Sequence, residues 1–190
     1  MRNATIAATL WPSSAGLLRP ALLVGAGVCL ITLGAKASVP FWPVPLTLQT
    51  LAISVVAAAY GLRLGGATVA AYLATGLLGM PVFAGMSAGI APFMGPTGGF
   101  LAGFLVMAAI IGAAADRGWD RAWPTTLAAM ALANVIVFVP GLLWLGTFTG
   151  YGEKLLAAGL WPFVAGTVVK TALAAALMPV AWALVSRLRG

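Results

Sequence analysis

Long apolar runs constrain this chain more than any other feature of its sequence. An α-helix needs about 20 mostly apolar residues to cross a bilayer, and six apolar runs approach that length. Hydrophobic residues fill 62% of the 190 positions and charged residues only 7%, against about 25% charged in soluble domains. The sequence therefore predicts an all-α integral membrane protein, a single six-helix transmembrane domain over residues 1–190. The expected spans are about 17–35, 46–61, 64–79, 98–115, 124–146 and 162–186; the third is short, so it could be tilted or partly re-entrant.

Basic residues between the runs predict the orientation. Short cytoplasmic loops are enriched in Lys and Arg. With the N-terminus inside, the cytoplasmic side receives seven arginines and the outer side two lysines, while Lys170 falls within a span. Both termini are then cytoplasmic. The inner residues are Arg2, Arg19, Arg63, Arg117, Arg121, Arg187 and Arg189, and the outer ones are Lys36 and Lys154.

The residue types exclude several kinds of chemistry. The chain has no histidine, one cysteine and three acids, so a His/Cys metal cluster or a Ser-His-Asp triad is impossible. Asp116 and Asp120 each have an arginine beside them in "DRGWDR", so we interpret this segment as a solvated turn and not as an acid/base pair. With no general base in any span, an intramembrane enzyme is disfavoured. No basic run alternates with aromatics, which excludes nucleic acid, and we expect no metal or cofactor.

Three connections on the predicted outer side combine proline, glycine and aromatic residues. They are "VPFWPVPLTLQT" (39–50), "GMPVFAGMSAGIAPFMGPTGGF" (79–100) and "GTFTGYGEKLLAAGLWPFVAG" (146–166). Specialised loops often carry function, and ligand pockets are mostly apolar with a few placed polar groups. We therefore expect these loops to cap a site for a small, partly apolar molecule.

Candidate ligand contacts divide into two kinds. Each aromatic could instead belong to an interfacial belt, and Asn134 could simply bond a neighbouring helix. "GPTGGF" could be a plain tight turn, or could direct backbone N–H groups at a ligand. The apolar candidates are Trp42, Phe83, Phe93, Trp144 and Tyr151, and the polar ones are Thr47, Gln49, Thr97 and Asn134, with Gly98 in the turn.

Lys170 is the most informative residue. It lies eight residues after Pro162, roughly 12 Å into the last span at 1.5 Å per residue. A lysine at the centre of a membrane helix costs about 2.5–3.5 kcal/mol on insertion scales. No acid lies in any predicted span. Three readings are open: the side chain snorkels outward, Glu153 reaches it, or a ligand supplies its counter-ion.

Five motifs occur in this order along the chain: "PVPLTLQT", "GLLGMPVFAG", "GPTGGFLAGF", "NVIVFVPGLLWL" and "WPFVAGTVVK". They resemble the motifs of the BioY family, the biotin-specific substrate-binding (S) components of energy-coupling-factor vitamin transporters. The resemblance covers about residues 17–186. It implies six transmembrane helices in the bacterial cytoplasmic membrane and a biotin site near the outer side, closed by the first and third loops.

The resemblance also implies partners and residue roles. A membrane T component and two cytoplasmic ATPases are expected, or else self-association; the T component would contact small residues four apart in the first helix, here Ala21, Gly25 and Cys29. Lys170 matches the family lysine. The family usually has aspartate where this chain has Thr167, which shares a helix face with Lys170. An S component for another vitamin remains the alternative.

Overall fold

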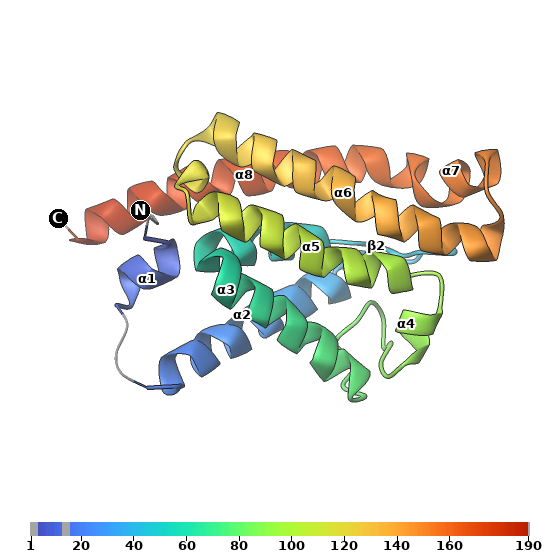
Figure 1. The fold of residues 1–190 in the computed structure, drawn as a ribbon, viewed down its shortest axis with the longest axis horizontal. Helices are drawn as coiled ribbons and strands as arrows, with labels where there is room; N and C mark the ends of the chain where they lie inside the picture. Colours follow the sequence, from blue (N-terminus) through green and yellow to red (C-terminus); the bar gives the residue numbers. More distant parts are fainter. Residues whose placement is uncertain (1–3, 13–15, 190) are drawn as a thin grey trace.

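The structure is a computed structural model that describes residues 4–12 and 16–189, and it shows an all-α bundle (Figure 1). Its long helices are joined by short helices and one small β-hairpin, so the predicted fold class is confirmed. The elements are α1 (Ile6–Leu10), α2 (Leu18–Lys36), β1 (Ser38–Val39), β2 (Leu46–Thr47), α3 (Gln49–Leu77), α4 (Ala91–Met94), α5 (Gly98–Ala115), η1 (Trp119–Arg121), α6 (Trp123–Thr149), α7 (Glu153–Gly159) and α8 (Trp161–Arg189).

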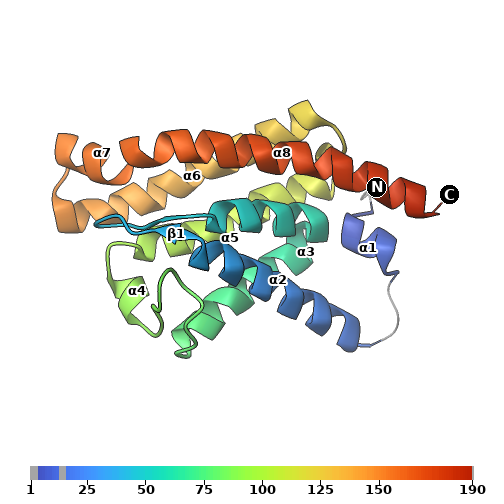
Figure 2. The ribbon, with the colours of Figure 1, turned by 180° about the vertical axis from the view of Figure 1, so that it is seen from behind.

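The element α3 is two antiparallel segments joined at Gly61. Gly61 has φ 78° and ψ −178°, a conformation that suits only glycine. A Cβ placed on Gly65 would lie 3.0 Å from Ala57 Cα, whereas eight residues of straight helix would separate the two by about 12 Å. Both views show the reversal (Figures 1 and 2). The five long apolar helices among the described residues therefore supply six crossings.

The second half of α3, residues 62–77, is the short span that the sequence left ambiguous. At 1.5 Å per residue it is about 24 Å long, a little less than the roughly 30 Å hydrocarbon core. It returns to the end of the bundle where α2 ends, so it crosses and does not re-enter (Figure 2). The preceding span begins at Gln49 and not at 46, because Leu46 and Thr47 pair with Val39 and Ser38 in the hairpin.

Glycines let α5 pack closely against α6. A Cβ on Gly103 would lie 3.2 Å from the Val137 carbonyl oxygen, and one on Gly99 would clash with the Pro140 carbonyl. Between helices in lipid there is no hydrophobic driving force, so such crossings are stabilised by close van der Waals packing, which small residues allow. The close approach brings residues of α5 and α6 to one cavity wall.

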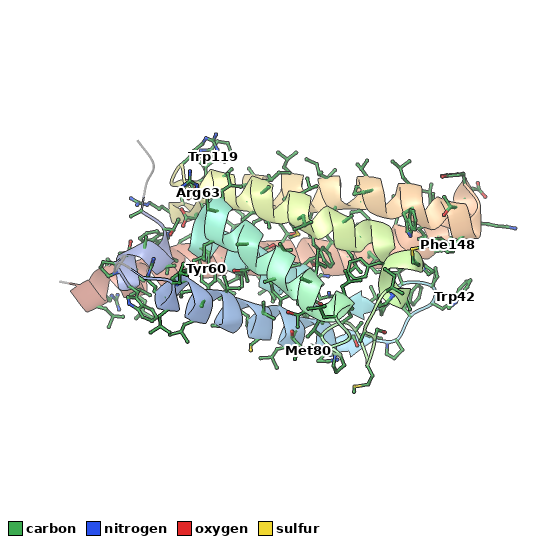
Figure 3. All side chains as sticks on the ribbon, turned by 60° about the horizontal axis from the view of Figure 1, so that its bottom comes forward. Trp42, Tyr60, Arg63, Met80, Trp119 and Phe148 are labelled. Atoms are coloured by element: carbon green, nitrogen blue, oxygen red, sulfur yellow. The ribbon has the colours of Figure 1, made fainter. Side chains whose placement is uncertain are left out.

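The two ends of the bundle differ. The N- and C-termini lie at one end (Figure 1), which also carries Arg63 and Trp119, whereas Trp42, Met80 and Phe148 lie at the opposite end (Figure 3). Placement of both termini at one end agrees with the predicted topology. Which end faces the cytoplasm remains a prediction, and Arg2 lies outside the described residues.

The interpretation of Asp120 as part of a solvated turn is wrong. Its side chain is buried, and Trp182 Nε1 donates to its Oδ2 at 2.6 Å. The Arg121 guanidinium lies 4.7 Å from the centre of the Trp182 ring, a cation–π contact. Asp120 thus joins η1 to α8. Burial raises the pKa of the Asp120 carboxyl, and the hydrogen bond from Trp182 opposes that rise.

Replacing Asp120 tests this connection. Because burial favours the protonated carboxyl in the folded state, the free energy of unfolding should fall as pH rises from the ordinary carboxyl range through the raised pKa. Asp120→Asn keeps an oxygen acceptor and should remove that fall. Asp120→Leu leaves the indole N–H unpaired and should cost about 1–3 kcal/mol. Thermal unfolding in detergent across acidic and neutral pH measures both, and an unchanged pH dependence in Asp120→Asn would contradict the assignment.

Cysteine labelling tests the orientation. In a Cys29→Ala background, Ser87→Cys places a thiol at an exposed position of the end opposite the termini, and Ala122→Cys places one at an exposed position of the terminal end. A membrane-impermeant thiol reagent applied to whole cells should label the first and spare the second, with both labelled after permeabilisation. The reverse pattern would invert the topology and move the site to the cytoplasmic side.

Candidate functional site

A cavity of about 440 Å³ opens at the end of the bundle away from the termini. Ligand pockets typically measure about 300–1,000 Å³. Its wall comes from α3, α5, α6 and α8 and from two loops. Counting the Gly61 turn as the second connection between spans, these are the first loop (residues 37–48) and the third loop (residues 78–97). Seven of the residues singled out in the sequence line it: Thr47, Gln49, Phe83, Thr97, Asn134, Thr167 and Lys170.

Phenylalanine rings form one side of the cavity. Phe100 stacks on Phe163 with ring centres 6.4 Å apart, and meets Phe138 edge-on at 6.1 Å. Phe104 follows Phe100 by one helical turn and also lines the cavity. Sequence reasoning missed Phe100, Phe104 and Phe163, because a phenylalanine inside an apolar span looks like any lipid-facing or core residue. The only available signal was the spacing of Phe104, four residues after Phe100, which is the last residue of "GPTGGF".

Lys170 fastens the last helix to the first loop. Its Nζ donates to the Thr47 carbonyl oxygen at 2.9 Å, from a half-buried position on the cavity wall. The side chain therefore does not snorkel to the membrane surface. Among the described lining residues it is the only charged one, and its sole hydrogen bond to the protein is to a neutral carbonyl. An anionic group in the cavity would offer a stronger, charge-assisted bond.

The first loop connects onward to the third through buried hydrogen bonds. Thr47 Oγ1 donates to Gln49 Oε1 at 3.0 Å, and Gln49 Nε2 donates to the Tyr72 hydroxyl at 2.8 Å. Tyr72 in turn donates to the Val82 carbonyl at 3.1 Å. The Gln49 amide is therefore held by protein groups on both sides. Tyr72 was missed in the sequence, where it is one tyrosine in an apolar run.

Lys36 holds the third loop from the other side. Its Nζ donates to the Phe83 carbonyl at 3.0 Å and to the Gly85 carbonyl. The Phe83 ring meets Tyr72 edge-on at 5.4 Å and Phe93 at 5.6 Å. The last residue of α2 thus anchors the loop that carries Phe83 over the cavity. Sequence reasoning used Lys36 only as a topology signal.

Two polar atoms on the wall have no hydrogen-bond partner among the described residues. Asn134 Nδ2 donates to the Met130 carbonyl at 2.9 Å and to Thr171 Oγ1 at 3.2 Å, so the amide nitrogen makes the interhelical bond that one reading expected. Within the described part of the chain, nothing donates to Asn134 Oδ1. The Thr50 hydroxyl is fully buried and also has no partner there. A buried hydroxyl without a partner costs free energy.

The "GPTGGF" turn begins α5 beside the cavity. Thr97 Oγ1 donates to the Pro92 carbonyl at 2.8 Å. Gly98 is packed so tightly against the Phe93 carbonyl that a Cβ would not fit, and it does not line the cavity. Trp144 Nε1 donates to the Gly95 carbonyl at 2.8 Å. Trp144 therefore fixes this turn from outside instead of lining the site.

Two further aromatic candidates also lie off the cavity wall. Trp42 is 82% exposed at the tip of the first loop, and Tyr151 is 66% exposed with its hydroxyl donating to the Leu143 carbonyl. Their positions fit the interfacial reading. The predicted partner contacts Ala21, Gly25 and Cys29 are all exposed along α2. Among the described residues no group of His, Cys, Asp or Glu could hold a metal ion.

Comparison with known proteins agrees with this geometry. The chain is 37% identical over 152 residues to a probable biotin transporter BioY of Pyrococcus horikoshii, across 80% of this chain and 89% of that protein. It is 36% identical to the biotin transporter BioY2 of Lactococcus lactis, across 80% and 83%. It superposes with a TM-score of 0.71 and 28% identity on the crystal structure of the S-component for biotin from an ECF-type ABC transporter, across 90% of this chain and 88% of that one.

The sequence model of the BioY family matches residues 4–187, nearly the whole chain. The resemblance drawn from the sequence motifs is thereby confirmed. The chain belongs to the BioY family.

Proposed function

We propose that this chain binds biotin and serves its uptake across the cytoplasmic membrane as the S component of an energy-coupling-factor transporter. The similar proteins described above carry biotin in their names. The observation that carries the proposal is the cavity, which joins an aromatic wall to one lysine and to Asn134 Oδ1, an oxygen that accepts no bond from the described residues. Family membership makes the chain a multi-pass membrane transport component and not an enzyme.

The parts of biotin match the parts of the cavity. Its carboxylate suits the Lys170 ammonium, since a charge-assisted bond is stronger than the present one to the Thr47 carbonyl. Its ureido N–H groups can donate to Asn134 Oδ1, which accepts no bond from the described protein. Its thioether ring and aliphatic chain suit the phenylalanine wall. Thr167, on the wall in place of the family aspartate, can supply a hydrogen bond but no charge.

The two loops would act as the lid over the bound molecule. Each is tied to the bundle by one lysine through backbone carbonyls, Lys170 for the first loop and Lys36 for the third. If a carboxylate takes Lys170, the bond to Thr47 is given up or shared. Ligand binding would then change how tightly the first loop is held.

The energy for uptake must come from partners. The sequence contains no nucleotide-binding motif, so we propose association with a membrane T component and a pair of cytoplasmic ATPases. The exposed face of α2 with Ala21, Gly25 and Cys29 is the proposed contact, because small residues allow another helix to approach closely. Association with further copies of the chain is the alternative. Copurification with each partner would separate the two.

Ligand choice is the first test. The purified protein should bind biotin, with a thermal shift and a calorimetric signal, and should ignore thiamine and riboflavin. The reason is the small aromatic cavity with one cation and no acid on its described wall. A signal from thiamine or riboflavin together with silence from biotin would assign the protein to another vitamin.

The Lys170→Met variant tests the carboxylate assignment. The substitution keeps length and removes charge, so biotin affinity should fall about ten- to a hundred-fold, corresponding to roughly 1.5–3 kcal/mol. Affinity for neutral biotinamide should change little. Calorimetry on both ligands measures the difference.

Lys36→Met is the matched control. It also frees a loop from a lysine but removes no residue from the described cavity wall. It should weaken biotin and biotinamide alike. Equal losses for the two ligands in Lys170→Met as well would mean that Lys170 acts only through the loop or binds the ureido end, and unchanged affinity for both would remove it from the site.

A further inference from the structure

A second cavity, of about 480 Å³, lies between the first and third loops, beside the cavity described above. Trp42 marks its end of the bundle in Figure 3. None of the described residues that line it is charged. The function proposed above makes no use of it. We call it the outer cleft and define it by Pro40, Phe41 and Trp42 of the first loop and by Ala84 and Gly85 of the third loop.

The outer cleft is continuous with the proposed biotin cavity. Pro45 and Ala84 line both, and both residues are half-buried, so they form the border between the two. Across this border the Phe41 ring meets the Phe163 ring edge-on, with ring centres 6.2 Å apart. Phe163 in turn stacks on Phe100 inside the biotin cavity. The aromatic wall of the biotin cavity therefore extends outward into the cleft.

The carboxyl end of the ligand lies close to this border. In the proposed function it bonds Lys170, whose Nζ donates to the Thr47 carbonyl oxygen. Thr47 follows Pro45 by two residues, about 7 Å of extended chain at roughly 3.3 Å per residue. Asn134, the proposed partner of the ureido end, does not line the cleft. A group joined to the carboxyl carbon would therefore leave the biotin cavity beside Pro45 and enter the outer cleft.

The lining of the cleft selects the kind of group. Its proline and phenylalanine side chains suit methylene groups, and the lining offers no charge to pair with a buried ion. A lysine side chain can lay its four-carbon stem on apolar surface while its charged head stays in water. The face of a tryptophan ring attracts an ammonium group, and Trp42 is 82% exposed. A lysine joined to biotin through its ε-amine offers the same stem, followed by an ammonium group in water.

We propose that the outer cleft receives the lysyl part of biotin amides, so that the ligands of this chain include N-ε-biotinyl-lysine as well as free biotin. This inference rests on the proposed function, because it takes the position of the carboxyl end from Lys170. The Lys170 ammonium donates to the amide oxygen in place of the carboxylate. The stem passes Pro45 and Ala84 and lies along Phe41, and the Trp42 ring faces the ammonium group.

Calorimetric titration of the purified full chain with three ligands tests the proposal: free biotin, biotin methylamide and N-ε-biotinyl-lysine. The methylamide carries the same amide without the stem, and it should bind more weakly than biotin because it loses the charge-assisted bond. Biotinyl-lysine should bind about ten-fold more tightly than the methylamide, since the cleft buries part of its stem. Biotinyl-lysine binding no better than the methylamide, beside normal biotin binding, would overturn this inference alone. Absence of biotin binding would overturn the proposed function and the inference together.

The Trp42→Ala variant locates the stem. Trp42 lines the outer cleft but not the biotin cavity, so affinities for biotin and for the methylamide should stay as in the parent. The advantage of biotinyl-lysine over the methylamide should fall from about ten-fold to about three-fold or less, because the ring face is lost. An undiminished advantage would place the stem elsewhere. Equal losses for all three ligands would mean that Trp42 acts only through the first loop; either result overturns the assignment.

Trp161→Ala is the matched control. Trp161 begins α8 at the same end of the bundle (Figure 1), is 64% exposed and lines neither the biotin cavity nor the outer cleft. Its replacement should leave the advantage of biotinyl-lysine within about two-fold of the parent, as expected for a site that shares no contacts with the ligand. A loss equal to that of Trp42→Ala would show general attraction to exposed indole rings and would overturn the site.

Discussion

The hydrogen bond from Lys170 to the Thr47 carbonyl is the contact on which the arrangement at the ligand end depends. It is the first of a series that continues through Gln49 and Tyr72 to the Val82 carbonyl. The series passes from α8 through the first loop and α3 to the third loop. Gln49 and Tyr72 in the middle of the series are buried, and partly satisfied buried networks are costly. A change at Gln49 or Tyr72 should therefore alter how both loops sit over the cavity.

This series also explains which polar groups remain for a ligand. Gln49 was predicted to contact the ligand, yet its amide is bonded on both sides by protein. The two ends of the Asn134 amide differ. Its nitrogen donates to Thr171, whereas its oxygen accepts no hydrogen bond from the described residues. That oxygen gives the cavity unmet hydrogen-bonding capacity, whereas the unpaired Thr50 hydroxyl is fully buried. Gln49 then shapes the loop, while Asn134 is the better candidate for recognition.

Periodicity and composition could predict the helices, because a bilayer demands long apolar segments whatever their packing. They could also single out Lys170, since a charge within a span is rare enough to need a reason. They could not reveal that Phe100 and Phe163 line a cavity, because an apolar ring satisfies lipid, core and pocket alike. Asp120 failed for the opposite reason: it stands in a short segment with three other charged residues, and the partner that buries it, Trp182, is 62 residues away.

Lys36 and Lys170 each hold one of the two loops over the cavity: Lys36 bonds the third loop and Lys170 bonds the first. Each lysine is held by backbone carbonyls and not by an acid, so each bond is weaker than an ion pair and can be exchanged. Lys170 lies on the cavity wall, where an anion can compete for it. Lys36 ends α2, the helix with the smallest buried share among the long helices of the described chain. A movement of α2 against a partner would therefore pull on the third loop, whereas a ligand that bonds Lys170 would act on the first loop. The Gln49–Tyr72 hydrogen bond lies between the two loops, so both movements would reach it.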